Sequence, residues 1–270
     1  MATPSAYKEL FGDFLNDTIP IGYEEDASSF IIRSEESLET IKWGLEQFAE
    51  ALSKATSKSV EVEIVLSKEK NSDWIKTYQQ SIQPLQIEKF YIRPTWEEPK
   101  EDLIDIIIDP ALAFGTGHHP TTATCLEAIS KYIQPDNEVC DVGCGSGILG
   151  IAAMKLGAIC DGCDTDPASI ENTQTNAKLN GVTFRKLWQG SIQKAPSTYD
   201  VVIANIVADV LIFLEKDLKK ALKDENSLLI LSGIMQDYKE KVLDAYKNYT
   251  LLEEIQKDEW ITLVLQKKEH

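Results

Sequence analysis

Apolar and polar residues follow two different rhythms along the chain. Over residues 1–66, the segments 7–14 and 29–32 alternate as strands do, and 34–57 carries apolar residues at helical spacing from Leu38 to Leu52. Residues 60–66, VEVEIVL, alternate as a half-buried strand should. The pattern therefore predicts a small α+β domain over 1–66, with no residue pattern of its own that indicates catalysis.

The remainder of the chain predicts a different architecture. A polar segment starts a linker helix over 67–84, and strands are expected at 85–92 and 103–109. Short apolar runs then alternate with helix-length segments: EVCDV, AICDGCD, VTFRKLW, YDVVIAN and SLLILSG. This alternation indicates an α/β domain over 85–270 with a doubly wound, mostly parallel sheet. YTLLEEIQ and WITLVLQKK, joined by a short turn, predict a closing antiparallel hairpin.

Charge and composition restrict the classes of partner that the protein is expected to bind. The formal net charge of −17 over 270 residues argues against direct nucleic-acid binding and favours a basic partner, although acidity can also serve solubility alone. No apolar run reaches the ~20 residues of a membrane span, and the first residues lack the order of a secretory signal. We expect a cytoplasmic monomer.

The five cysteines suit a reducing compartment in which they stay free thiols. Cys160 and Cys163 form one CxxC, but no second Cys or His pair stands at matching spacing. No metal site is predicted, and these thiols are interpreted as buried strand residues.

A glycine-rich turn between a strand and a helix is the first candidate site. Gly143, Gly145 and Gly147 allow a tight turn and close approach of backbone to a ligand, and the helix that follows offers free amides. Glycines alone leave a nicotinamide dinucleotide site open, because Gly145, Gly147 and Gly150 also fit GxGxxG.

Two acidic residues favour a cationic ligand at this turn. Asp141 at the strand end would repel a pyrophosphate but can meet the amino group of a methionine moiety. Asp164 ends the next strand, where an acid accepts both ribose hydroxyls. The plainer alternative is that both acids cap helices or face solvent. Asp141, GxGxG and Asp164 together resemble the S-adenosylmethionine-dependent methyltransferases.

A longer stretch resembles one family of these enzymes. IIIDPALAFGTGHHPTTATCLEAI (106–129), DVGCGSGILGIAAMKLGA, DTDPASIENTQTNAKLNGV, VVIANIVADVL and LSGI are similar to the PrmA-type methyltransferases of large-subunit ribosomal protein eleven. The resemblance covers about residues 71–235, and Ala111 departs from it where the family commonly has glycine.

The resemblance implies cofactor contacts at four positions: Thr122, Gly143, Asp164 and Asn205. It also places Phe114 and Thr116 in a loop that shapes the mouth of the site. Asn205 would further orient the attacking amine, as a catalytic residue.

Each of these positions also has a structural interpretation. Thr122 or Asn205 can serve only as a cap, and Phe114 only as a core aromatic. Adjacent His118 and His119 do not share a helix face, which favours a structural role over proton transfer.

The resemblance implies N-methylation of lysine side chains, with the terminal amine as a second acceptor, on a basic ribosomal protein recognised by residues 1–66. No residue stands out as a general base. Three alternatives stay open: methylation of another protein's lysines, a nicotinamide-dependent oxidoreductase, and a non-catalytic cofactor-binding scaffold.

Overall fold

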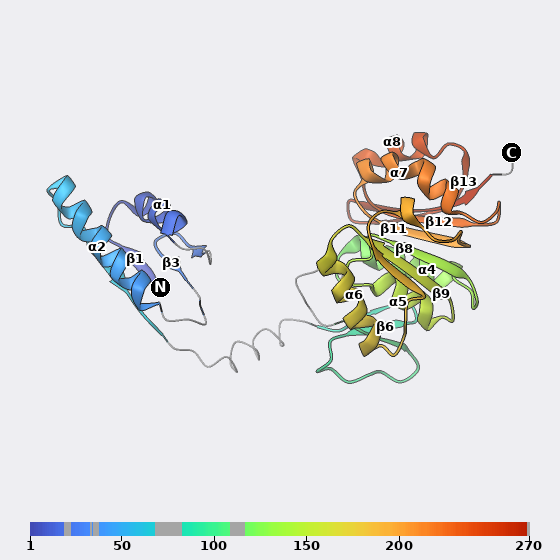
Figure 1. Cartoon of the computed structure of the whole chain (residues 1–270), viewed down its shortest axis with the longest axis horizontal. Helices are drawn as coiled ribbons and strands as arrows, with labels where there is room; N and C mark the ends of the chain where they lie inside the picture. The colour runs from blue at the N-terminus through green and yellow to red at the C-terminus, as the bar shows by residue number, and fades with distance from the viewer. Residues whose placement is uncertain (19–22, 33, 35–37, 68–82, 109–116, 269–270) are drawn as a thin grey trace. The chain divides into compact units, whose positions relative to one another are not determined.

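The computed structural model describes residues 1–18, 23–32, 34, 38–67, 83–108 and 117–268. The chain divides into two compact units, Met1–Thr77 and Tyr78–His270 (Figure 1). This division falls inside the segment 67–84. The linker helix expected there lies almost wholly outside the described residues and stays a prediction.

Unit 1 follows the order strand, helix, two strands, helix, strand. Its elements are β1 (Ala2–Pro4), α1 (Lys8–Thr18), β2 (Glu24–Glu25), β3 (Phe30–Ile31), α2 (Glu39–Thr56) and β4 (Val62–Ile64). The strands pair antiparallel in the order β2-β3-β1-β4, which is the split βαβ arrangement. Phe11, Phe30 and Leu45 belong to the core of this unit.

The strand expected over 7–14 is wrong, because residues 8–14 belong to α1. Leu10, Phe11, Phe14 and Leu15 recur at three- and four-residue spacing, which is the helical period, and Phe11 and Leu15 are 0% exposed. The strand within 29–32, the helix within 34–57 and the strand within 60–66 are confirmed.

Unit 2 begins with a small three-stranded sheet: β5 (Leu85–Ile87), β6 (Phe90–Arg93) and β7 (Ile104–Ile107). β5 and β6 are antiparallel, so the single strand expected over 85–92 is wrong. The chain reverses at Glu88, whose φ of 49° is a left-handed turn conformation. β7 lies within the strand expected at 103–109 and runs parallel to β6.

A seven-stranded sheet forms the centre of unit 2. Its strands are β8 (Glu138–Val142), β9 (Ile159–Asp164), β10 (Lys186–Gln189), β11 (Val201–Asn205), β12 (Leu228–Met235), β13 (Tyr249–Lys257) and β14 (Trp260–Lys267). In the order β10-β9-β8-β11-β12-β14-β13, the first five strands are parallel and the last two form an antiparallel hairpin. This confirms the predicted fold class.

Helices cover both faces of this sheet. They are α4 (Pro120–Tyr132), α5 (Ile148–Lys155), α6 (Pro167–Leu179), α7 (Ala208–Ala221) and α8 (Lys239–Ala245). Val139 and Ile203 belong to the same apolar cluster as buried residues of α4 and α5. Their neighbours Cys140 and Val202 cluster instead with residues of α7 and α8, on the opposite face (Figure 1).

The strand order reverses beside β8. The chain proceeds outward from β8 through β9 to β10, then returns to place β11 on the other side of β8. In open α/β sheets, ligands bind at the carboxyl ends of strands at such a switch point. The fold therefore indicates where the site should lie before any side chain is considered.

Candidate active site

A pocket of about 540 Å³ opens at this switch point. Its lining includes the residues that directly follow four parallel strands or lie next to their ends: Gly143, Thr165, Gly190 and Ile206. Its size is that of a small-molecule site. Thr122, Gly143, Gly145, Asp164 and Asn205, all predicted from the sequence, lie in its wall.

The glycine loop lies tightly against its surroundings. Gly143 has a φ of 72°, and a Cβ built there would stand 2.6 Å from the side chain of Ile206. Gly147, with a φ of 80°, would place a Cβ 2.8 Å from Thr173. Conformation and space therefore both require glycine at these two positions. Gly147 does not line the pocket; it is the N-cap residue of α5.

Asp164 is held in the pocket wall by backbone amides. One carboxylate oxygen, Oδ2, accepts from the Gly145 amide at 3.0 Å, and Oδ1 accepts from the Asp166 amide at 3.0 Å. Asp166 itself caps α6 by accepting from Ala168 at 3.0 Å, as predicted. The pocket thus contains a carboxylate whose position is fixed before any ligand enters.

Asp141 lies outside the pocket lining and is 1% exposed. Its Oδ2 accepts from the Gly150 amide at 2.9 Å, while its Oδ1 has no hydrogen-bond partner among the described residues. Burial raises the pKa of this carboxyl to about 7, against the lowering effect of the Gly150 hydrogen bond. Its expected contact with a ligand stays a prediction.

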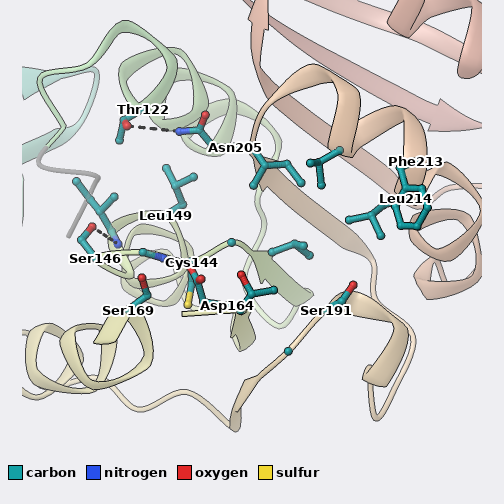
Figure 2. A pocket seen from close by; sticks show the side chains of 18 residues that line it. Thr122, Cys144, Ser146, Leu149, Asp164, Ser169, Ser191, Asn205, Phe213 and Leu214 are labelled. Carbon is teal, nitrogen blue, oxygen red and sulfur yellow. Dashed lines mark hydrogen bonds between the residues drawn. The ribbon is translucent and has the colours of Figure 1, made fainter. Parts of the chain in front are cut away.

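Thr122 and Asn205 come together from distant parts of the sequence. Asn205 ends β11, and its Nδ2 donates to Oγ1 of Thr122 at 3.5 Å (Figure 2). Thr122 lies in the first turn of α4 and is buried. This long hydrogen bond joins the residue at the switch point to the helix opposite.

The two histidines make structural contacts. His119 caps α4, where its Nδ1 accepts from the Thr121 amide at 3.4 Å, and its ring lies 5.0 Å from that of Trp260. Nε2 of His118 lies 3.0 Å from the carbonyl oxygen of Gln83. Phe114, Thr116 and Ala111 lie outside the described residues, so the predictions made for them stand as they were.

Ser191 and Phe213 were missed by sequence reasoning, and both line the pocket (Figure 2). Ser191 Oγ is buried and has no hydrogen-bond partner among the described residues. Its position just after the end of β10 was the signal in the sequence, because polar residues at strand ends are site candidates. Phe213 is 77% exposed on α7. The signal for Phe213 was an apolar residue on the outer side of an amphipathic helix.

The described residues carry no cluster of three or more His, Cys, Asp or Glu side chains that could hold a metal ion. All five cysteines are buried and free. Within the same described part of the chain, no helix has the length and apolar character needed to span a bilayer.

Comparison with known proteins decides the family. The family model for ribosomal protein L11 methyltransferase (PrmA) matches residues 23–268. This chain belongs to the PrmA family. The oxidoreductase alternative is set aside, since the family is one of methyltransferases.

Individual relatives agree with this assignment to the PrmA family. The ribosomal protein L11 methyltransferase of Nitratiruptor sp. is 50% identical over 260 residues, covering 96% of this chain and 92% of the relative. That of Wolinella succinogenes is 47% identical over 265 residues, covering 98% and 96%. A crystal structure of a ribosomal protein L11 methylase from Lactobacillus delbrueckii subsp. bulgaricus matches with a TM-score of 0.65 and 31% identity, covering 70% of this chain and 100% of that chain.

Proposed function

We propose that this PrmA-family protein transfers methyl groups from S-adenosylmethionine to amines of ribosomal protein L11. Lysine side chains are the principal acceptors, and the terminal amine is a second one. Family membership and the names of relatives at up to 50% identity support the substrate. The fixed carboxylate of Asp164 in the pocket wall is the observation that supports the cofactor.

The residues around the pocket fit this cofactor. Its ribose hydroxyls match Asp164, where each hydrogen bond to the carboxylate would contribute about 1.5–3 kcal/mol. Its carboxylate suits the positive end of the dipole of α5, which begins directly after the glycine loop. The carboxyl of Asp141 is buried outside the pocket lining with its Oδ1 unpartnered, and we propose that it stabilises the cationic groups of the cofactor. The buried Ser191 Oγ offers a further polar group in the wall.

When bound, the cofactor supplies a methyl group activated by a cationic sulfur. The protein must then chiefly align the acceptor nitrogen with it, a contribution that can reach about 7–11 kcal/mol. We assign this task to Asn205: its Nδ2 donates to Thr122, which leaves its side-chain Oδ1 to accept from an incoming amine.

The acceptor amine must be neutral to attack. An ordinary lysine has a pKa near 10.4, so neutralising it at pH 7 costs about 4–5 kcal/mol. Ile206, Val210, Phe213 and Leu214 form an apolar part of the pocket wall, which disfavours the charged ammonium and lowers its pKa. We therefore assign no general base.

The setting of the reaction is also a proposal. Five buried free thiols suit the reducing cytoplasm, and the net charge of −17 suits a basic ribosomal protein. Unit 1 would recognise that substrate. The monomeric state stays a prediction.

Labelled S-adenosylmethionine and purified L11 test the proposal directly. We expect label on lysine amines of L11, located by mass spectrometry. In a parallel reaction with total ribosomal proteins, label only on proteins other than L11 would favour another lysine substrate. Cofactor binding without turnover in either reaction would favour a scaffold.

Asp164→Ala and Asp166→Ala form a matched pair for the cofactor site. Losing the ribose contacts should weaken S-adenosylmethionine binding at least ~10-fold in calorimetry. Losing the helix cap at Asp166 should lower the melting temperature and leave affinity within about twofold. Equal affinities in the two variants would contradict the ribose role of Asp164.

A further inference from the structure

Helix α6, together with its C-cap residue Asn180, buries four polar side chains, Ser169 among them, and the other three hydrogen-bond to other elements. Thr173, Asn176 and Asn180 stand at positions i, i+3 and i+7 and are 0%, 1% and 7% exposed. A helix usually turns apolar residues to the core, and a buried polar group is costly unless it is hydrogen-bonded. The partners of these side chains therefore indicate what they do.

Thr173 contacts the glycine loop in two ways. Its Oγ1 donates to the carbonyl oxygen of Gly145 at 3.0 Å and lies 3.3 Å from Sγ of Cys144. Its methyl group occupies the space where a Cβ of Gly147 would lie, 2.8 Å away. One side chain thus both holds the loop and determines how closely the loop packs.

Asn176 holds the next carbonyl of the same loop. Its Nδ2 donates to the carbonyl oxygen of Ser146 at 2.8 Å. Gly145 and Ser146 both line the pocket, whereas Thr173 and Asn176 do not. The two helix residues therefore act on the pocket wall from behind.

Asn180 holds a second element in the same way. Its Oδ1 accepts from the Ile107 amide at 2.8 Å, and its Nδ2 donates to the Ile107 carbonyl oxygen at 2.7 Å. Ile107 ends β7, which precedes α4 and Thr122 along the chain. Helix α6 and its cap are thereby hydrogen-bonded to both the glycine loop and β7.

We propose that Thr173 and Asn176 are positioning residues for cofactor binding, with Asn180 anchoring the same helix to β7. Glycines at 143, 145 and 147 all have positive φ and little intrinsic preference for one loop shape. Two hydrogen bonds from a rigid helix select that shape before the ligand arrives, which lowers the cost of binding. The inference rests on the proposed use of S-adenosylmethionine.

Three threonine substitutions in the full-length protein test it. Thr173→Val removes the hydroxyl and keeps the branched shape, and Thr173→Ser keeps the hydroxyl. Thr175→Val is the matched control, because its exposed hydroxyl donates only within the helix, to Glu171 at 3.0 Å. We expect Thr173→Val to raise the Kd for S-adenosylmethionine about 5–10-fold, as loss of one positioning hydrogen bond would.

The other two variants should stay within about twofold of wild type. For Thr173→Val, KM for the cofactor should rise while kcat at saturation stays within about twofold, and amide exchange over 143–148 should accelerate. Thr173→Ser should restore slow exchange, which a merely structural loss elsewhere would not produce.

An unchanged Kd in a Thr173→Val protein with a lowered melting temperature would overturn the inference. If that variant does not fold, Asn176→Ala is measured in the same way and decides the question. Wild-type protein that binds no S-adenosylmethionine would instead refute the proposed function. If wild type binds S-adenosylmethionine and Thr173→Val and Asn176→Ala bind it equally well, only the positioning role is refuted.

Discussion

At the scale of single residues, the charge state of the buried Asp141 should make the stability of the protein depend on pH. Burial disfavours its carboxylate form, the Gly150 amide opposes that effect, and the nearby charge of Asp164 adds to it, which leaves the pKa at about 7. A folded pKa raised above the usual 3.8 means that the group's contribution to stability is present below about pH 4. That contribution is lost as the pH rises through 7.

Asp141→Asn should therefore change the pH dependence of stability. The variant cannot ionise, so its free energy of unfolding relative to wild type should increase by roughly 2–4 kcal/mol between about pH 4 and pH 9. Urea unfolding at both pH values measures this difference. Parallel pH profiles for the two proteins would show that Asp141 is ionised at little cost.

The same substitution should weaken cofactor binding. A cation near Oδ1 favours the carboxylate, so wild-type affinity for S-adenosylmethionine should increase as pH rises through about 7. The variant should show a flat and weaker affinity, measured by calorimetry over the same range. A wild-type affinity independent of pH would show that the charge of Asp141 does not affect cofactor binding.

At the scale of elements, a bulge in β12 shapes the turn after Asn205. The register of β12 against β14 shifts between Leu231 and Ile234. Gly233 lies there with a φ of 81°, and a Cβ on it would stand 2.3 Å from the carbonyl oxygen of Ile206. The bulge thus lets the backbone of the turn at Ile206 approach β12 closely.

Gly233→Ala should displace this turn and with it Asn205. We expect a loss of stability above the ~1–2 kcal/mol of left-handed strain alone, and a fall in kcat of at least about tenfold. Gly181→Ala is the control, since Gly181 has a φ of 66° but nothing within 4 Å of its built Cβ. It should lose only the strain energy and keep kcat; equal effects on kcat would remove the role of the bulge.

Elements also show where sequence reasoning succeeded. The long alternation of strands and helices from β8 onward predicted the sheet, and the polar residues at its strand ends, Asp164 and Asn205, predicted the pocket. Short segments failed: residues 7–14 were assigned the wrong period, and a turn at Glu88 divides what was expected as one strand.

The role of α6 could not be predicted from its sequence. Thr173, Asn176 and Asn180 are residue types that usually face solvent, and a pattern of polar positions does not reveal that a glycine loop and β7 lie behind them. Ser191 was missed for a related reason. Whether Ser191 lines the pocket depends on which strand ends lie next to one another, and the sheet order determines that.

At the scale of the whole molecule, net charge should govern encounter with the substrate. A protein of charge −17 attracts a basic partner over distances that salt shortens, from about 30 Å at 0.01 M to about 8 Å at physiological ionic strength. KM for L11 should therefore rise several-fold between low and physiological salt while kcat stays nearly constant. Initial-rate kinetics would measure this, and a flat KM would mean that the acidity serves solubility alone.

The two-unit organisation predicts that cofactor binding and substrate recognition separate. All the described residues that line the pocket belong to unit 2, which has its own hydrophobic core. Residues 78–270 alone should thus fold and bind S-adenosylmethionine within about twofold of the full-length affinity. Methyl transfer to L11 should fall about 100-fold in kcat/KM, because the tethered recognition unit no longer raises the local concentration of substrate.

Adding unit 1 as a separate polypeptide should restore little activity, since the tether is what supplies that concentration. Full activity of residues 78–270 on L11 would assign recognition to the catalytic unit itself, whereas loss of cofactor binding would show that unit 1 supports the pocket.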